Sequence, residues 1–238
     1  MSPSSPAPAM GIRDEVAALK RERILTAAVE LFYERGYENT TLDAVAERLG
    51  VTKPFIYAHF SAKSELLAEI CSRGVAAALQ AMEGALAMAD ATPTEKLDAL
   101  GRRFVTAVLQ SQKYIAIFTR EEKNLLPRDY ERISQMRRDF DRKLAGLLTE
   151  GTATGEFRIA DPRLAALAIG GMVGWAYVWY RPQGRLSVEA LAEEMAALVL
   201  AMAQARPGSP PPGKAAGKVA RQAAARPPRA GSPRGGRR

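Results

Sequence analysis

The stretch from Thr40 to Leu67 concentrates side chains that can bind a nucleic acid. Thr41 and Thr52 each stand at the start of a short helical pattern, where a hydroxyl and the first N–H groups of a helix can bind phosphate. Lys53 can donate hydrogen bonds to guanine acceptors, and Phe55 can pack on the methyl group of thymine. The alternative for Phe55 is packing against the preceding long helix. These residue types predict contacts to both the backbone and the bases of DNA.

Two short helices joined by a tight turn must position these side chains. Apolar residues recur at helical spacing between Leu42 and Leu49, and Gly50 can adopt the left-handed conformation that ends a helix. Thr52 is a suitable N-cap, and Pro54 falls in the first turn of the second helix, where its missing N–H leaves no bond unmade. This pattern predicts a helix-turn-helix whose second helix, with Pro54 in its first turn, enters the DNA major groove.

The same stretch resembles the DNA-binding domain of the TetR family of bacterial transcriptional regulators. The matching residues are Thr40-Thr41, Ala46, Gly50-Val51-Thr52, Tyr57, His59-Phe60, Lys63 and Glu65-Leu66-Leu67. The sequence departs from the family pattern at Pro54-Phe55, where members often carry Gly followed by a small or hydroxyl residue. The resemblance implies that Tyr57, His59 and Lys63 contact backbone phosphates, as the matching positions do in the family.

The positive charge of the chain is concentrated at its C-terminal end. The formal net charge is +8, but nine of the 34 Lys and Arg residues, and none of the 26 Asp and Glu residues, lie in 206–238. Residues 206–238 are rich in Pro, Gly and Ala, so we expect a disordered basic tail. Such a tail can add counterion-release attraction to DNA, or it can be a solvated appendage without a role.

The scarcity of His and Cys argues against most enzyme classes. His59 and Cys71 are the only residues of their types, so the usual nucleophile–base pairs and metal-ligand spacings are missing. We therefore expect no catalytic site, no metal and no cofactor, and a buried structural role for Cys71. No positively charged leader with an apolar core opens the chain, so the expected location is the cytoplasm.

The rest of the sequence predicts an all-α protein of nine helices with a TetR-like fold. No segment alternates like a strand, and Thr92-Pro93-Thr94-Glu95 is typical of a capping box at a helix start. The expected helices cover about 13–34, 42–49, 53–60, 62–88, 93–111, 114–125, 129–150, 162–180 and 188–205. The expected parts are a disordered arm at 1–11, the DNA-binding domain at 12–61, a ligand-binding and dimerisation domain at 62–205 and the tail at 206–238.

The helix expected at 162–180 is unusual because it contains 17 consecutive residues without a charge, from Leu164 to Tyr180. A helix that is apolar on all sides is buried on all sides or lies in lipid. Seventeen residues are at the lower limit for a bilayer span, so a soluble role is favoured. We expect ligand space on one side and a second subunit on the other, with a homodimer formed through this helix and the last one. In the last helix, Leu191, Met195, Leu198 and Met202 form the apolar stripe.

The segments Phe157–Pro162 and Trp175–Ser187 are similar to the C-terminal domain of a TetR subgroup that includes fatty-acid- and acyl-CoA-responsive repressors. The resemblance implies a small hydrophobic effector, which we expect to be an acyl-CoA. The candidate ligand-binding residues are Phe104, Val108, Phe118, Arg120, Met136, Arg137, Met172 and Trp175. The apolar ones can equally be plain core. The arginines can bind a phosphate or carboxylate, or pair with Glu121, Glu122 or Asp141.

The predicted function is a sequence-specific, ligand-responsive transcriptional regulator, most simply a repressor that a hydrophobic effector releases from its operator. One DNA-binding domain, called the reading head below, makes few contacts with DNA. A two-fold dimer on a pseudo-palindromic operator is therefore expected. The alternative is a non-specific architectural DNA-binding protein that uses the basic tail.

Overall fold

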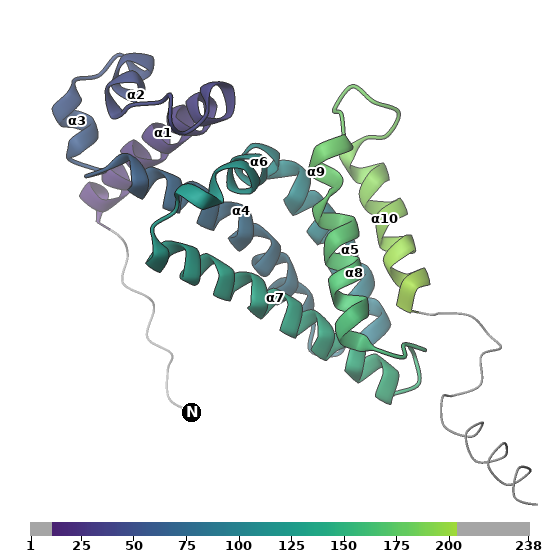
Figure 1. Ribbon diagram of the computed structural model, residues 1–238. Helices are drawn as coiled ribbons and strands as arrows, with labels where there is room; N and C mark the ends of the chain where they lie inside the picture. The colour runs from purple at the N-terminus through teal and green to yellow at the C-terminus, as the bar shows by residue number, and fades with distance from the viewer. Residues whose placement is uncertain (1–10, 204–238) are drawn as a thin grey trace, which may run out of the picture. The chain divides into compact units, whose positions relative to one another are not determined.

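A computed structural model describes residues 11–203 of the chain. Within this range all regular structure is helical, with ten α-helices, one short 3₁₀ helix and no strand (Figure 1). The helices are α1 (Ile12–Arg35), α2 (Leu42–Leu49), α3 (Lys53–Tyr57), α4 (Lys63–Leu86), α5 (Pro93–Gln110), α6 (Gln112–Glu121), η1 (Glu122–Asn124), α7 (Pro127–Ala153), α8 (Pro162–Gly174), α9 (Ala176–Trp179) and α10 (Val188–Ala203). The prediction of an all-α fold is confirmed, while the expected arm and tail lie largely outside the described residues.

The helix expected at 162–180 is interrupted at Trp175, which separates α8 from α9. At the interruption the chain makes a tighter turn, in which the Val178 N–H donates to the carbonyl of Trp175, three residues back, at 3.0 Å. The other expected helices are present with small shifts at their ends. No helix in the described part of the chain is long and apolar enough to cross a membrane.

One hydrophobic cluster joins α1, α2 and α3 to the first half of α4. Phe32, Ile56, Phe60 and Leu67 are fully buried in it, and Ile117 of α6 completes it from the side of the later helices. The expected boundary between residues 61 and 62 therefore falls inside a shared core. The short helices α2 and α3 depend on this cluster, because helices of that length are not stable alone in water.

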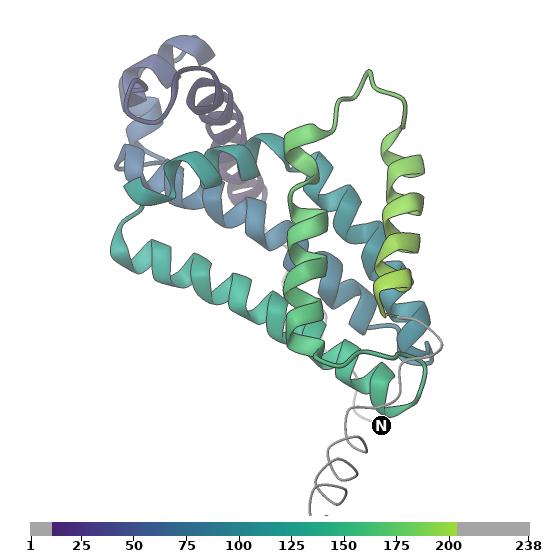
Figure 2. The same cartoon turned by 45° about the vertical axis from the view of Figure 1, so that its right-hand side comes forward.

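A second hydrophobic cluster holds α5, α7, α8 and α10 against the second half of α4 (Figure 2). The rings of Phe104 and Phe140 lie 4.7 Å apart, centroid to centroid, at its centre. Helices α5 and α10 approach closely at Gly101, where an added Cβ would stand 2.9 Å from the Cα of Ala196. Leu191 and Met195 of α10 are buried on this α5 side.

The predicted helix caps explain where two of these helices begin. Thr92 and Glu95 form the expected capping box, with Glu95 N–H donating to Thr92 Oγ1 at 3.2 Å and Thr92 N–H donating to Glu95 Oε2 at 2.8 Å. Asp161 caps α8 by accepting from the N–H groups of Arg163 and Leu164 at 3.0 and 3.1 Å. These caps satisfy backbone donors that a helix start leaves free.

Candidate functional site

The turn between α2 and α3 has the geometry that the sequence predicts. Thr41 caps α2 by accepting from the Ala44 N–H at 3.1 Å. Gly50 is left-handed, with φ 64° and ψ 33°, and the Val51 N–H donates back to the Ala46 carbonyl at 3.0 Å. A residue with a side chain would be strained at this φ, so glycine is what allows the tight turn.

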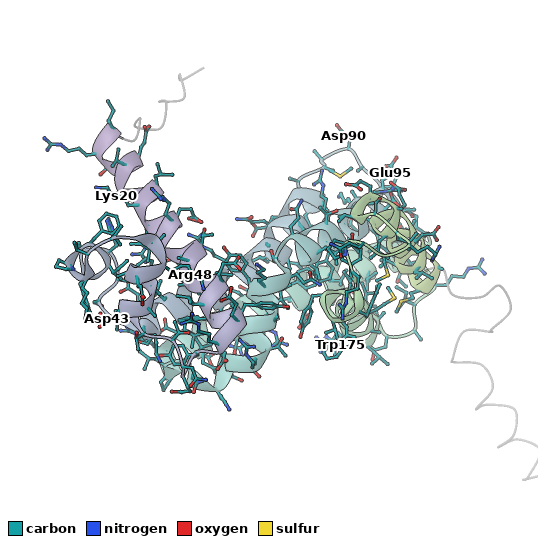
Figure 3. All side chains as sticks on the ribbon, turned by 90° about the horizontal axis from the view of Figure 1, so that it is seen from above. Lys20, Asp43, Arg48, Asp90, Glu95 and Trp175 are labelled. Carbon is teal, nitrogen blue, oxygen red and sulfur yellow. The ribbon has the colours of Figure 1, made fainter. Side chains whose placement is uncertain are left out.

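The outer face of α3 is free for contact with a partner. Thr52, Lys53, Pro54 and Tyr57 are exposed, and the side chain of Thr52, although at the N-cap position, caps nothing. The Lys53 ammonium pairs with Asp43 of α2 at 2.5 Å (Asp43 is labelled in Figure 3). Both partners are well exposed, so this ion pair is weak and Lys53 can exchange it for a base contact.

Phe55 lies on the side of α3 that faces α1, and His59, just beyond the end of α3, lies beside it. Their rings are 5.5 Å apart, and the Lys20 ammonium of α1 is 5.8 Å from the Phe55 ring centre (Lys20 is labelled in Figure 3). Phe55 is half-buried against the first hydrophobic cluster, the one that joins α1, α2 and α3 to α4. The structure therefore supports the packing alternative for Phe55, and only the exposed part of its ring is available to a thymine methyl.

Lys63 is tied to the loop between α1 and α2. Its ammonium donates to the Tyr37 carbonyl at 2.9 Å and lies 4.2 Å from the Tyr37 ring centre. The side chain thus holds this loop in place, and the expected phosphate contact would have to use its remaining N–H capacity.

Arg21 is a positioning residue that sequence reasoning missed. Its guanidinium donates to the His59 carbonyl at 2.6 Å, pairs with Glu65 and Glu69 at 3.2 and 2.5 Å, and lies 3.9 Å from the Phe60 ring centre. Arg21 therefore fixes the end of α3 relative to α1 and α4. No spacing within one helix signals contacts between residues this far apart in the chain.

Arg120 occupies a different place from the one expected. Its guanidinium donates to the carbonyl of Phe32, and to that of Tyr33 at 3.3 Å, at the C-terminal end of α1. The neighbouring Glu121 is buried and accepts from the Tyr37 N–H at 3.2 Å. Arg120 does not line the cavity enclosed by α4 to α9. Together with Glu121 it attaches α6 to the C-terminal end of α1 and the loop that follows it.

A cavity of about 480 Å³ lies among α4 to α9, and its volume falls in the range typical of small-molecule sites. Five of the eight expected ligand-binding residues line it: Phe104, Val108, Phe118, Arg137 and Trp175. Met136 and Met172 do not line it. Met136 accepts a hydrogen bond from Ser72 at 3.9 Å, and Met172 packs against the second hydrophobic cluster, the one formed by α5, α7, α8, α10 and the second half of α4. Apolar side chains at helical spacing look the same in a sequence whether they face a core or a cavity.

The polar part of the cavity wall was only partly foreseen. Thr119 and Tyr177 line it and hydrogen-bond to each other at 3.1 Å, and Glu122 and Asp141 add two carboxylates. Burial raises the pKa of Asp141, and the charge of Arg137 opposes that shift. Within the described residues no group of three or more His, Cys, Asp and Glu side chains could hold a metal ion.

An apolar face on α8, α9 and α10 has no partner within the described chain. Leu164, Leu167, Trp175, Trp179 and Leu198 are 48–64% exposed (Trp175 is labelled in Figure 3), and of these Leu167 and Trp175 also line the edge of the cavity. The stripe expected for the last helix is corrected here, since only Leu198 of its four residues faces outward. Leu191 and Met195 are buried in the core, and Met202 is partly buried against it.

Comparisons with known proteins agree with this architecture. Residues 24–70 match the family described as bacterial regulatory proteins, tetR family, and residues 90–203 match the tetracyclin repressor-like C-terminal domain. The HTH-type transcriptional repressor KstR2 of Rhodococcus jostii is 28% identical over 183 residues, covering 76% of this chain and 89% of that protein. The fatty acid metabolism regulator protein of Bacillus subtilis is 30% identical over 159 residues, covering 65% of this chain and 79% of that protein.

A solved structure shows the same fold with ligands bound. AibR in complex with isovaleryl coenzyme A and operator DNA superposes with a TM-score of 0.66 at 27% identity, over 76% of this chain and 98% of that one. The family consists of transcriptional regulators rather than enzymes. From the helix-turn-helix, the helical domain behind it and the extent of these matches, the chain belongs to the TetR family of bacterial transcriptional regulators.

Proposed function

We propose that this protein is a repressor that leaves its operator when a small hydrophobic effector fills the cavity. The observation that carries the proposal is the double role of α6. Phe118 and Thr119 line the cavity, while the next two residues, Arg120 and Glu121, hold the end of α1 and the Tyr37 N–H. A shift of α6 caused by a ligand would therefore act directly on the DNA-binding region.

The proposed DNA contacts follow from exposure on the α2–α3 unit. Tyr57 and Thr52 are free to bind phosphates, with Thr41 at the N-terminus of α2, and Lys53 is the best placed to read a base. Phosphate contacts from His59 and Lys63 remain part of the proposal, although both side chains also support the fold. Residues 12–61 then act as the reading head and 62–205 as the effector and dimerisation part.

A homodimer through the apolar face of α8 to α10 would place two reading heads on one operator. Exposed patches of this kind mark interfaces between subunits. A pseudo-palindromic operator would require the two α3 helices to stand about 34–36 Å apart, one helical turn of DNA. Effector binding would change that spacing by moving α4 and α6, and the ligand can shift the equilibrium only by its differential affinity for the two arrangements.

We propose an acyl-CoA as the effector. The cavity offers an aromatic and aliphatic lining for an acyl chain, with Arg137 exposed beside it for a phosphate. Support also comes from the relatives, which include a fatty acid metabolism regulator and a protein solved with isovaleryl coenzyme A and operator DNA.

The test begins by selecting an operator from random duplex DNA with the full-length protein. Fluorescence anisotropy of the labelled operator complex is then followed during titration with medium- and long-chain acyl-CoAs, the matching free acids, aromatic acyl-CoAs and cationic drugs. Release by thioesters is the expected result. Release only by cationic drugs would contradict the acyl-CoA assignment, and failure to select any sequence would contradict sequence-specific binding.

A further inference from the structure

Arg137 stands apart from the other arginines of α7. Arg128 and Arg132 pair with Asp129, Arg138 pairs with Glu131, and Arg142 pairs with Asp139. Within residues 11–203 Arg137 forms no ion pair; its guanidinium lies 5.6 Å from the ring centre of Phe118 on the cavity wall. It is therefore available to an anionic group at the cavity edge.

Asp141 lies one helical turn beyond Arg137, at the spacing where an Arg–Asp pair is common. The pair does not form: the Arg137 guanidinium lies over the Phe118 ring, and the Asp141 carboxylate lies beside Gly170 of α8. Its Oδ1 atom stands 3.8 Å from the position that a Cβ at Gly170 would take, and both residues line the cavity. No described residue donates a hydrogen bond to this half-buried carboxylate. The carboxylate oxygens still reach solvent, so a ligand that displaces their water must supply a hydrogen-bond donor of its own.

The charges on the wall also determine which ligand groups can lie beside Asp141. Glu122 adds a second carboxylate to the lining, and it too has no ion-pair partner among the described residues. Arg137, the one cation of the lining, is exposed. A ligand carboxylate next to Asp141 would therefore meet like charge in a site partly shielded from water, where repulsion is strong.

We propose that Asp141 selects ligands with a neutral hydrogen-bond donor, such as a hydroxyl or amide N–H, and makes the cavity reject free carboxylic acids, while Arg137 binds an anionic group of the same ligand at the cavity edge. The inference rests on the proposed function only in taking this cavity as the effector site. It explains how an acyl thioester of coenzyme A, which carries amide N–H groups and phosphates beyond its neutral thioester, is distinguished from the fatty acid of the same chain.

The experiment compares 1-dodecanol with dodecanoate, which share a chain and differ in the polar end. Binding to the full-length protein, without DNA, is measured by quenching of tryptophan fluorescence, because Trp175 lines the cavity. The wild type should bind the alcohol more tightly than the carboxylate by at least about tenfold. Asp141→Asn should bring the two affinities close together, mainly by tightening the carboxylate.

Asp139→Asn is the matched control, because Asp139 lies on the same helix but pairs with Arg142 and does not line the cavity. It should leave the affinity ratio unchanged, and Asp141→Glu, which keeps the charge, should leave it on the side of the alcohol. Equal affinities in the wild type, an unchanged ratio in Asp141→Asn, or no binding of either ligand would overturn the inference. Because no DNA is present, loss of operator release with these ligands would count against the proposed function alone.

Discussion

Replacing Arg120 with Ala should weaken the coupling between the effector cavity and the DNA-binding region, while each site keeps its own ability to bind. The guanidinium donates to the carbonyls of Phe32 and Tyr33 and pairs with Glu121 at 2.9 Å. The α1–α6 contact keeps the Lys113–Glu30 ion pair at 2.6 Å and the Tyr37–Glu121 hydrogen bond, so the fold should persist.

The size of the effect follows from the exposure of this side chain. Hydrogen bonds to charged groups contribute roughly 1.5–3 kcal/mol when buried. The Arg120 side chain is 47% exposed, so water replaces part of each contact and a loss of about 1 kcal/mol is the reasonable expectation. Ordinary coupling is about 1–3 kcal/mol, so a ligand weakens operator binding about 5–150-fold. In the variant, this factor should be roughly fivefold smaller.

The assay is operator anisotropy with and without saturating acyl-CoA, in wild type and Arg120→Ala. Operator affinity without ligand should stay within about twofold, while the weakening caused by ligand shrinks by roughly fivefold. Arg128→Ala is the control, since that side chain is 83% exposed and only loosely paired at 3.6 Å. An unchanged ligand effect in Arg120→Ala would refute the reasoning that α6 carries the signal through this contact.

Three further predictions concern the cavity, the exposed face of α3 and the single cysteine. Gly174→Leu should lower acyl-CoA affinity at least about tenfold, because the new side chain fills the cavity. Thermal stability should not fall, because an added Cβ meets nothing within 4 Å and Leu is the better helix former. Calorimetry measures the affinity, and a thermal melt measures the stability. Tyr57→Ala should weaken binding to operator and random DNA alike, whereas Lys53→Ala should relax preference at one base-pair step at a cost of about 1–3 kcal/mol, as measured on a panel of operator variants. Burial and two nearby carboxylates raise the pKa of Cys71 to about 12, so the native thiol should react with a disulfide reagent at pH 8 far more slowly than in urea; equal rates would contradict its burial.

The helices were predictable because their signals are local. The capping box at Thr92 and Glu95, the Asp161 cap and the left-handed Gly50 are each set by residues a few positions apart. The interruption at Trp175 was not predictable, because the uncharged run continues through it and only the three-residue turn to Val178 marks the break.

The site was predictable where a motif fixes it and not where it depends on packing between distant segments. Arg120 looked like a ligand-binding residue because nothing in the α6 sequence shows that the end of α1, nearly ninety residues earlier, lies beside it. Arg137 and Asp141 have the spacing of an ordinary ion pair, and the α7 sequence alone does not show that Arg137 lies over the Phe118 ring of another helix while Asp141 lies beside Gly170. Met136 and Met172 carry the same apolar signal as true lining residues.

The central claim is that effector and operator compete through one conformational equilibrium. The most direct test compares the acyl-CoA affinity of the free protein with the acyl-CoA affinity of the operator complex. Linkage requires that the operator lower the affinity for the effector by the same factor as the effector lowers the affinity for the operator, about 5–150-fold for ordinary coupling. Calorimetric titrations of the free protein and of the complex, at one salt concentration, give that factor. Equal factors from calorimetry and anisotropy are the predicted result, and an acyl-CoA affinity that is the same with and without operator would contradict the account.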